Sequence, residues 1–128
     1  MNDAPSYFLK AKAALSAAKL LLEAGDADGA CNRAYCAMFD AAHAALFALG
    51  AEDAGAPIKT HNGLIAKFGQ RVVASGHLAA EFGADLNRVQ SLRLLADYSG
   101  DPVTLDKAKW AFERAEAFVS AVSSKFGL

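Results

Sequence analysis

Proline, cysteine and tryptophan are scarce in this sequence of 128 residues, which holds three, two and one of them respectively. The prolines stand near the start, in the middle and late in the chain, where helices can begin or end. Cys31 and Cys36 are five positions apart, so a helix does not place them on one face, and no close histidine completes a zinc site. We therefore expect two apolar helix residues in a reducing compartment, and neither a metal nor a cofactor.

Long apolar runs and an excess of one charge are also absent. No uninterrupted apolar run reaches membrane-spanning length, and the first residues lack the apolar stretch of a signal peptide. We expect a soluble, cytoplasmic protein that does not contact a membrane. With 13 basic and 14 acidic residues the net charge is −1, so no basic excess attracts nucleic acid in general. RNA binding would need a local site or a surface built by a dimer.

Helix-forming residues are abundant. Hydrophobic residues make up 54% of the chain, and alanine, the best helix former, supplies many of them. Apolar residues recur three and four positions apart, and no β-type alternation competes with this pattern. The pattern predicts helices over about residues 5–24, 26–49, 60–75, 78–98 and 103–126, with a loop at 51–59. The fold class is therefore all-α: an up-and-down antiparallel bundle of about five helices, forming a single domain over residues 1–128.

The second predicted helix contains a cluster of polar residues, namely Asn32, Arg33 and Tyr35. Arg33 and Asp40 lie two turns apart, so they share a face, whereas Tyr35 points to a different side. On the pattern alone, a surface ion pair beside a core tyrosine is favoured over a binding site.

A second cluster stands at the start of the third predicted helix. Thr60 can cap this helix, and His61 falls in its first turn, where the helix dipole favours a neutral imidazole. A lone histidine in that position is more often a capping or packing residue than a catalyst.

The third cluster runs from Arg88 to Tyr98 in the fourth predicted helix. Arg93 and Asp97 are four residues apart on one face and can pair, and Arg93 falls near the apolar stripe. A partly buried arginine needs a carboxylate or a phosphate, because an unpaired charge away from water is costly. The cluster is therefore either a structural Arg93–Asp97 pair or a phosphate clamp with Tyr98 beside it.

The clusters follow one another as NRAYCAMFDAAHAAL, THNGLIAKFG and RLLADYS, before a helix that contains AFVSAV. In this order and spacing the chain resembles the HEPN family, in its short standalone branch, from about Tyr7 to Leu128. The resemblance implies an up-and-down bundle that often forms a homodimer. It also implies frequent pairing with a minimal nucleotidyltransferase encoded nearby, in pairs that often behave as toxin and antitoxin.

Active members of the family are metal-independent ribonucleases, whose signature is an arginine, four to six residues and a histidine. In the resemblance, Arg93 takes the place of the arginine, but Tyr98 stands where the histidine is expected and no histidine follows Arg93. Asp40 likewise stands where many members of this branch carry a histidine. A tyrosine titrates too high to be a good base at neutral pH unless it is strongly perturbed.

Three functions therefore remain open. The first is a binding module, the partner of a nucleotidyltransferase, that holds RNA or a nucleotide near Arg93; Tyr98 could also accept a nucleotidyl group. The second is a ribonuclease whose catalytic residues are Arg93, Asp97 and Tyr98. The third is a purely structural, oligomerising bundle. The residues expected to bind RNA or nucleotide are Asn32, Arg33, Tyr35 and Arg88.

Overall fold

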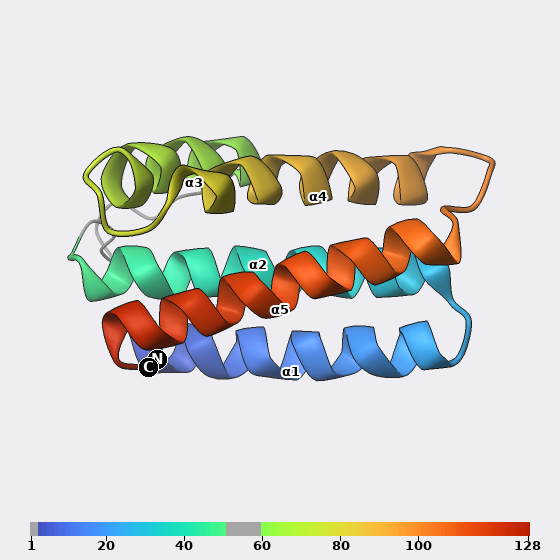
Figure 1. Cartoon of the computed structure of the whole chain (residues 1–128), viewed down its shortest axis with the longest axis horizontal. Helices are drawn as coiled ribbons and strands as arrows, with labels where there is room; N and C mark the ends of the chain where they lie inside the picture. Colours follow the sequence, from blue (N-terminus) through green and yellow to red (C-terminus); the bar gives the residue numbers. More distant parts are fainter. Residues whose placement is uncertain (1–2, 51–59) are drawn as a thin grey trace.

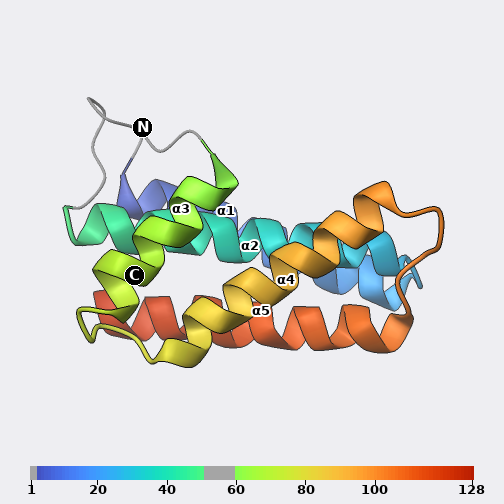
Figure 2. The same ribbon diagram turned by 90° about the horizontal axis from the view of Figure 1, so that it is seen from above.

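A computed structural model describes residues 3–50 and 60–128, and the predicted loop at 51–59 lies outside the described residues. The described part contains five α-helices and no strand, so the predicted all-α bundle is confirmed. The helices are α1 (Ala4–Glu23), α2 (Ala27–Ala48), α3 (His61–Phe68), α4 (Ala80–Tyr98) and α5 (Leu105–Phe126). Figure 1 shows α1, α2 and α5 as long rods lying side by side, with α1 beginning and α5 ending at the same end of the bundle. In Figure 2, α3 and α4 lie across the α2 and α5 layer.

Local capping explains where the helices begin. Asp26 accepts a hydrogen bond from the backbone N–H of Gly29 at 2.9 Å, and Thr60 accepts one from Gly63 at 2.9 Å. Each side chain satisfies one of the N–H groups that a helix start leaves without a partner. The Thr60 cap was predicted from the sequence. Asp28, in the first turn of α2, accepts from the backbone N–H of Val103 at 2.8 Å and so ties the start of α2 to the residues just before α5.

One long helix predicted over residues 60–75 is instead two elements. The α-helix ends at Phe68 and a π-helix, η1 (Gly69–Val73), follows it. A turn at Gly76, where φ is +85°, then leads to α4. The sequence pattern cannot distinguish one π turn from an α turn, because both keep apolar side chains on the inner face over so short a length.

The core is built largely from small side chains on α1 and α2 and from large ones around α5. The alanines of α1 and α2 let the two helices approach closely, because their side chains end at Cβ. Phe118 of α5 is fully buried and packs against Phe68 and Phe82, at ring-centroid distances of 5.2 and 6.2 Å. Leu105, which the periodicity places in the inner stripe of the last helix, is 51% exposed, because it is the first residue of α5.

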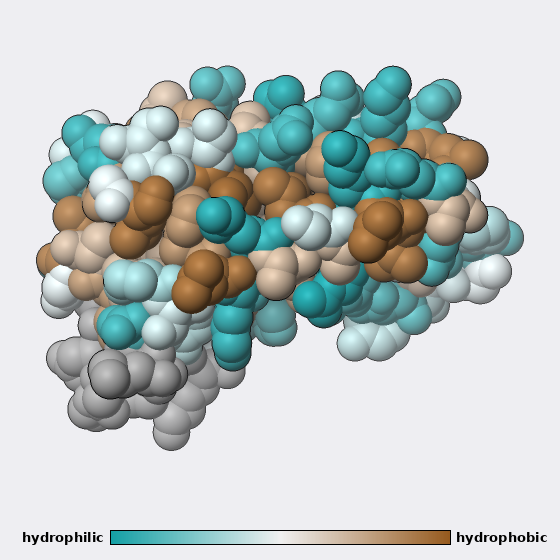
Figure 3. Space-filling model, turned by 90° about the horizontal axis from the view of Figure 1, so that it is seen from below, coloured by the Kyte–Doolittle hydropathy of each residue, from teal (hydrophilic) through white to brown (hydrophobic). Residues whose placement is uncertain are grey.

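Apolar side chains also reach the surface. The face seen in Figure 3, where α1 is nearest to the viewer, carries apolar patches between hydrophilic ones, and Leu9 and Leu20 of α1 are exposed. None of the helices in the described residues is long and apolar enough to cross a membrane.

Candidate functional site

Arg93 is the centre of a polar cluster that α4 presents to α2. Its guanidinium pairs with Asp97 one turn later, with Nη1 3.1 Å from Oδ2, so the predicted pair is confirmed. The side chain is only 15% exposed, and the guanidinium carbon lies 5.0 Å from the ring centroid of Tyr35 on α2. The Nε atom of Arg93 is buried and donates to no atom of the described residues. This arginine is therefore positioned by a carboxylate and an aromatic face while one of its donors lacks an acceptor.

Asn32 of α2 completes the connection between the two helices. Its Nδ2 atom donates to Oδ1 of Asp97 at 3.5 Å, and its Oδ1 accepts from the thiol of Cys36 at 3.7 Å. The structure thus brings together Arg93, Asp97, Asn32 and Tyr35, four of the residues that the sequence singles out. Asn32 and Tyr35 on α2 lie more than 50 positions before Arg93 and Asp97 on α4 in the chain, and the packing of α4 on α2 brings the two pairs together.

His61 also reaches this cluster. The Thr60 cap fixes the first turn of α3, and the Nδ1 atom of His61 lies 2.9 Å from the phenol oxygen of Tyr35, within hydrogen-bonding distance. The imidazole is exposed and stacks at a tilt on Phe39, with ring centroids 4.6 Å apart. Because Nδ1 is engaged with Tyr35, Nε2 is the ring nitrogen left to meet a ligand.

The protonation states of Tyr35 and His61 follow from their burial and from the positive charge of Arg93. Burial raises the pKa of Tyr35 to about 12, although Arg93 acts in the opposite direction, so the phenol keeps its proton at neutral pH. Burial is also the largest cause that lowers the pKa of His61, and the charges of Arg93 and His43 lower it further. The site therefore combines a permanent cation, a neutral phenol and a neutral imidazole near pH 7.

We predict that the pKa of His61 lies below the 6.5 of an ordinary histidine and rises in Arg93→Gln, because a nearby positive charge is removed. In the pH range between the folded pKa and 6.5, the unfolded chain binds this proton and the folded chain does not. The contribution of His61 to stability is therefore present above pH 6.5 and is lost as the pH falls through the folded pKa. An NMR titration of the His61 ring proton measures both values; a pKa at or above 6.5 in the wild type would contradict the prediction.

Comparison with known proteins identifies the family. Residues 4–125 match the HEPN domain family. The chain is 37% identical over 91 residues to a UPF0332 protein of Gloeobacter violaceus, an alignment that covers 71% of this chain and 68% of the relative. The chain belongs to the HEPN family. Its resemblance to that family, drawn from the three sequence clusters, is confirmed.

Two further relatives of this HEPN domain are similar over more of its length. A protein of Methanocaldococcus jannaschii named "Putative toxin MJ0605" is 34% identical over 108 residues, covering 84% of this chain and 77% of the relative. A UPF0332 protein of Thermotoga maritima is 32% identical over 115 residues, covering 88% and 83%. All three alignments are long enough to span most of the helices described above.

The remaining residues singled out in the sequence lie apart from Arg93. Tyr98 is 80% exposed and borders a shallow depression with Ser91, Leu94 and Leu95, on a different face of α4 from Arg93. Arg88 is 67% exposed and pairs with Asp85 at 3.7 Å. Their assignment to a binding site stays a prediction.

Arg33 is exposed on α2 and forms no ion pair with Asp40 within 4 Å, so the expected surface pair is absent from the described residues. Burial raises the pKa of Asp40, and the charges of Lys10, His43 and Arg33 oppose that rise. Arg33 therefore still acts on Asp40 through its charge. No group of three or more histidine, cysteine or acidic side chains in the described residues could hold a metal ion.

His61 belongs to the site, although its position in the sequence predicted only a structural role. The family signature places a histidine after Arg93 in the same helix, whereas the structure brings one from α3, before Arg93 in the chain. The available signal was the segment THNGL, in which Thr60 caps the helix that carries His61. That signal indicates a fixed histidine but not the partner it meets.

Proposed function

We propose that this HEPN domain binds the phosphate groups of RNA or of a nucleotide at Arg93. The observation that carries the proposal is the state of Arg93, which is mostly buried, held over Tyr35 and left with a buried Nε donor that has no acceptor in the described residues. A planar guanidinium matches two phosphate oxygens, and a charged hydrogen bond formed away from water is stronger than one at the surface. Binding of a fluorescent single-stranded RNA to wild type and Arg93→Ala tests this function.

We propose further that the domain acts as a homodimer and with a nucleotidyltransferase of the minimal type, as one component of a toxin–antitoxin pair. The family resemblance supports this pairing, and the name of the archaeal relative agrees with a toxin role. Large apolar side chains that are exposed on α4 and α5 supply contact area for such partners. They are Leu94, Leu95, Tyr98, Leu105 and Trp110.

Tyr98 is the residue that a nucleotidyltransferase partner could modify. Its exposed phenol oxygen would attack the α-phosphate of ATP, lose its proton and displace pyrophosphate. After incubation with the partner and ATP, we expect intact-mass spectrometry to show one added adenylyl group in wild type and none in Tyr98→Phe. Tyr7→Phe, which removes a phenol at the other end of the chain, serves as the matched control and should still be modified. An unmodified wild type would remove this role of Tyr98 but not RNA binding.

A second candidate function is ribonuclease activity, and the position of His61 is the observation that favours it. The missing motif histidine removes an imidazole from α4, but His61 places one within reach of Tyr35 and near enough to Arg93 for the charge to lower its pKa. In such a reaction the ribose 2′-oxygen attacks phosphorus and gives its proton to the imidazole. The bond to the 5′-oxygen breaks, and that oxygen takes up a proton. Arg93 would stabilise the charge that develops on phosphate.

Cleavage of RNA by His61→Ala tests this candidate. We expect the variant to lose about 100-fold or more in rate, the usual contribution of a general base. Asn62→Ala changes the next exposed residue of α3 and should cleave as fast as wild type. Equal rates in wild type and His61→Ala would exclude His61 as the base, and no cleavage by any of the three proteins would leave the binding function alone.

A further inference from the structure

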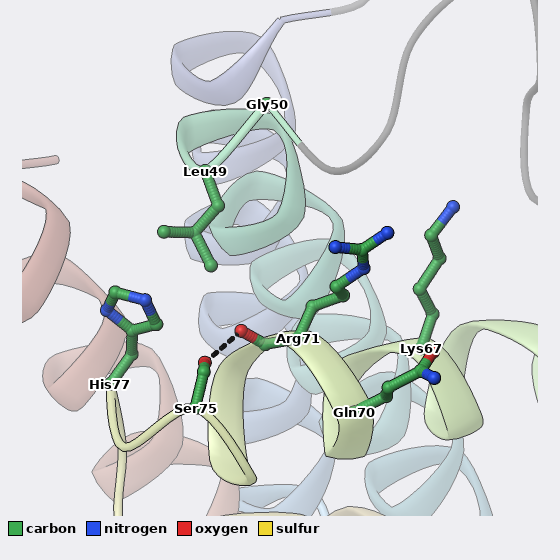
Figure 4. Close-up of a pocket in the computed structure, with 7 residues that line it drawn as sticks. All are labelled: Leu49, Gly50, Lys67, Gln70, Arg71, Ser75 and His77. Carbon is green, nitrogen blue, oxygen red and sulfur yellow. Dashed lines mark hydrogen bonds between the residues drawn. The ribbon is translucent and has the colours of Figure 1, made fainter.

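A polar pocket lies at one end of the bundle, away from the Arg93 cluster. It has a volume of about 800 Å³ and separates the end of α2 from α3, η1 and the segment that leads to α4. Figure 4 shows Lys67 and Arg71 extending in the same direction from α3 and η1, with His77 and Leu49 on the other side. The described residues that line it are Leu49, Gly50, Lys67, Gln70, Arg71, Ser75 and His77.

Among the described residues that line the pocket, Lys67 and Arg71 are cationic, Gln70 and Ser75 are polar, and none carries a carboxylate. Lys67 and Arg71 carry permanent charges, and neither forms an ion pair within 4 Å in the described part of the chain. By contrast, Arg88, Arg93 and Arg114 pair with aspartates at 3.7, 3.1 and 3.8 Å. In a protein of net charge −1, this concentration of unpaired positive charge in a hollow is a local feature rather than a property of the whole surface.

The backbone around the pocket is fixed by contacts that do not use the charged groups. The hydroxyl of Ser75 donates to the carbonyl oxygen of Arg71, as drawn in Figure 4. The backbone N–H of His77 donates to the carbonyl of Val72 at 2.9 Å, and the His77 ring lies 6.1 Å from that of Phe126. Single π turns such as η1 occur often at functional sites. The lining therefore keeps its shape while the side chains of Lys67, Gln70 and Arg71 can turn toward a ligand.

We propose that this pocket binds a small polyphosphate anion, separately from the Arg93 site. Lys67 and Arg71 would share its charges, since Arg offers several donors and Lys a compact one. The amide of Gln70 and the imidazole of His77 would add hydrogen bonds to further phosphate oxygens. The volume falls in the range of small-molecule sites and has room for three linked phosphates, either free or as part of a nucleotide.

Isothermal titration of the full chain with inorganic triphosphate and, separately, with ATP and AMP tests the proposal. We expect triphosphate to bind wild type, and Lys67→Ala/Arg71→Ala to weaken binding by at least about tenfold. Lys19→Ala/Lys109→Ala removes two exposed positive charges elsewhere and should bind as wild type does. ATP binding tighter than triphosphate would identify a nucleotide as the source of the phosphates, and equal binding would identify the phosphate chain alone.

The Arg93→Ala variant separates this proposal from the function proposed above, because its triphosphate binding should be unchanged even where its RNA binding is lost. If the double variant is less stable than wild type, the melting temperature provides a second measurement. We expect triphosphate to raise the melting temperature of wild type and not that of the Lys67/Arg71 variant. Equal affinity of triphosphate for wild type and the Lys67/Arg71 variant would overturn the proposal. So would a wild type that binds a short RNA but no triphosphate, since the pocket would then be part of a strand-binding surface.

Discussion

Replacing Arg93 with alanine is expected to lower the affinity for single-stranded RNA by at least about 30-fold. A hydrogen-bonded charge contributes about 2 kcal/mol, which corresponds to that factor. The guanidinium is mostly buried, so water and salt screen its interaction with phosphate less than at an exposed arginine. Fluorescence anisotropy at one fixed salt concentration measures the effect, because the affinity for RNA depends on salt.

Two further variants show whether the loss reports a local contact. Arg93→Lys keeps the charge but not the planar donor pair, and we expect an intermediate loss. Lys109→Ala removes a positive charge from an exposed position on α5, and we expect a change of about threefold or less. If Arg93→Ala lowered the melting temperature while RNA affinity stayed as in wild type, Arg93 would serve helix packing only, as in the structural hypothesis.

Phe118→Ala is expected to produce a large loss of stability, about 3–5 kcal/mol in the free energy of unfolding. The ring is fully buried and meets the rings of Phe68 and Phe82, so its removal leaves a cavity between α3, α4 and α5. Urea unfolding followed by circular dichroism measures the change at constant slope.

Phe112→Ala is the matched control, because Phe112 lies on the same helix and is only partly buried. Its loss should be clearly smaller. Equal losses in the two variants, or a loss below about 1 kcal/mol in Phe118→Ala, would contradict the packing described here.

Much of the fold could be predicted because helix signals are local. The apolar spacing, the caps at Asp26 and Thr60 and the glycine that follows α1 act within one or two turns of the chain. The π turn at Gly69–Val73 could not be predicted, because the apolar pattern over so short a length fits an α turn equally well. The exposure of Leu105 was missed because the periodicity shows which face is apolar but not where the neighbouring helices end.

The candidate site could be predicted only in part for the same reason. The Arg93–Asp97 pair lies four residues apart in one helix, and this spacing is sufficient to expect it. The contact between Tyr35 and His61 spans 26 residues and two helices, and it depends on tertiary packing that no short motif encodes. For the same reason the sequence could name Asn32 and Tyr35 as candidates but could not place them against Arg93.

The link between α4 and α2 has a consequence for how this domain exchanges with solvent. Arg93 and Asp97 connect α4 to Tyr35 and Asn32, so the group proposed to bind phosphate also holds the end of its own helix in place. A ligand that draws Arg93 away from Asp97 would exchange an internal counterion for an external one. The amide protons in the last turns of α4 would then report the occupancy of the site through their hydrogen-exchange rates, while those of α1 and α2 would continue to report global unfolding.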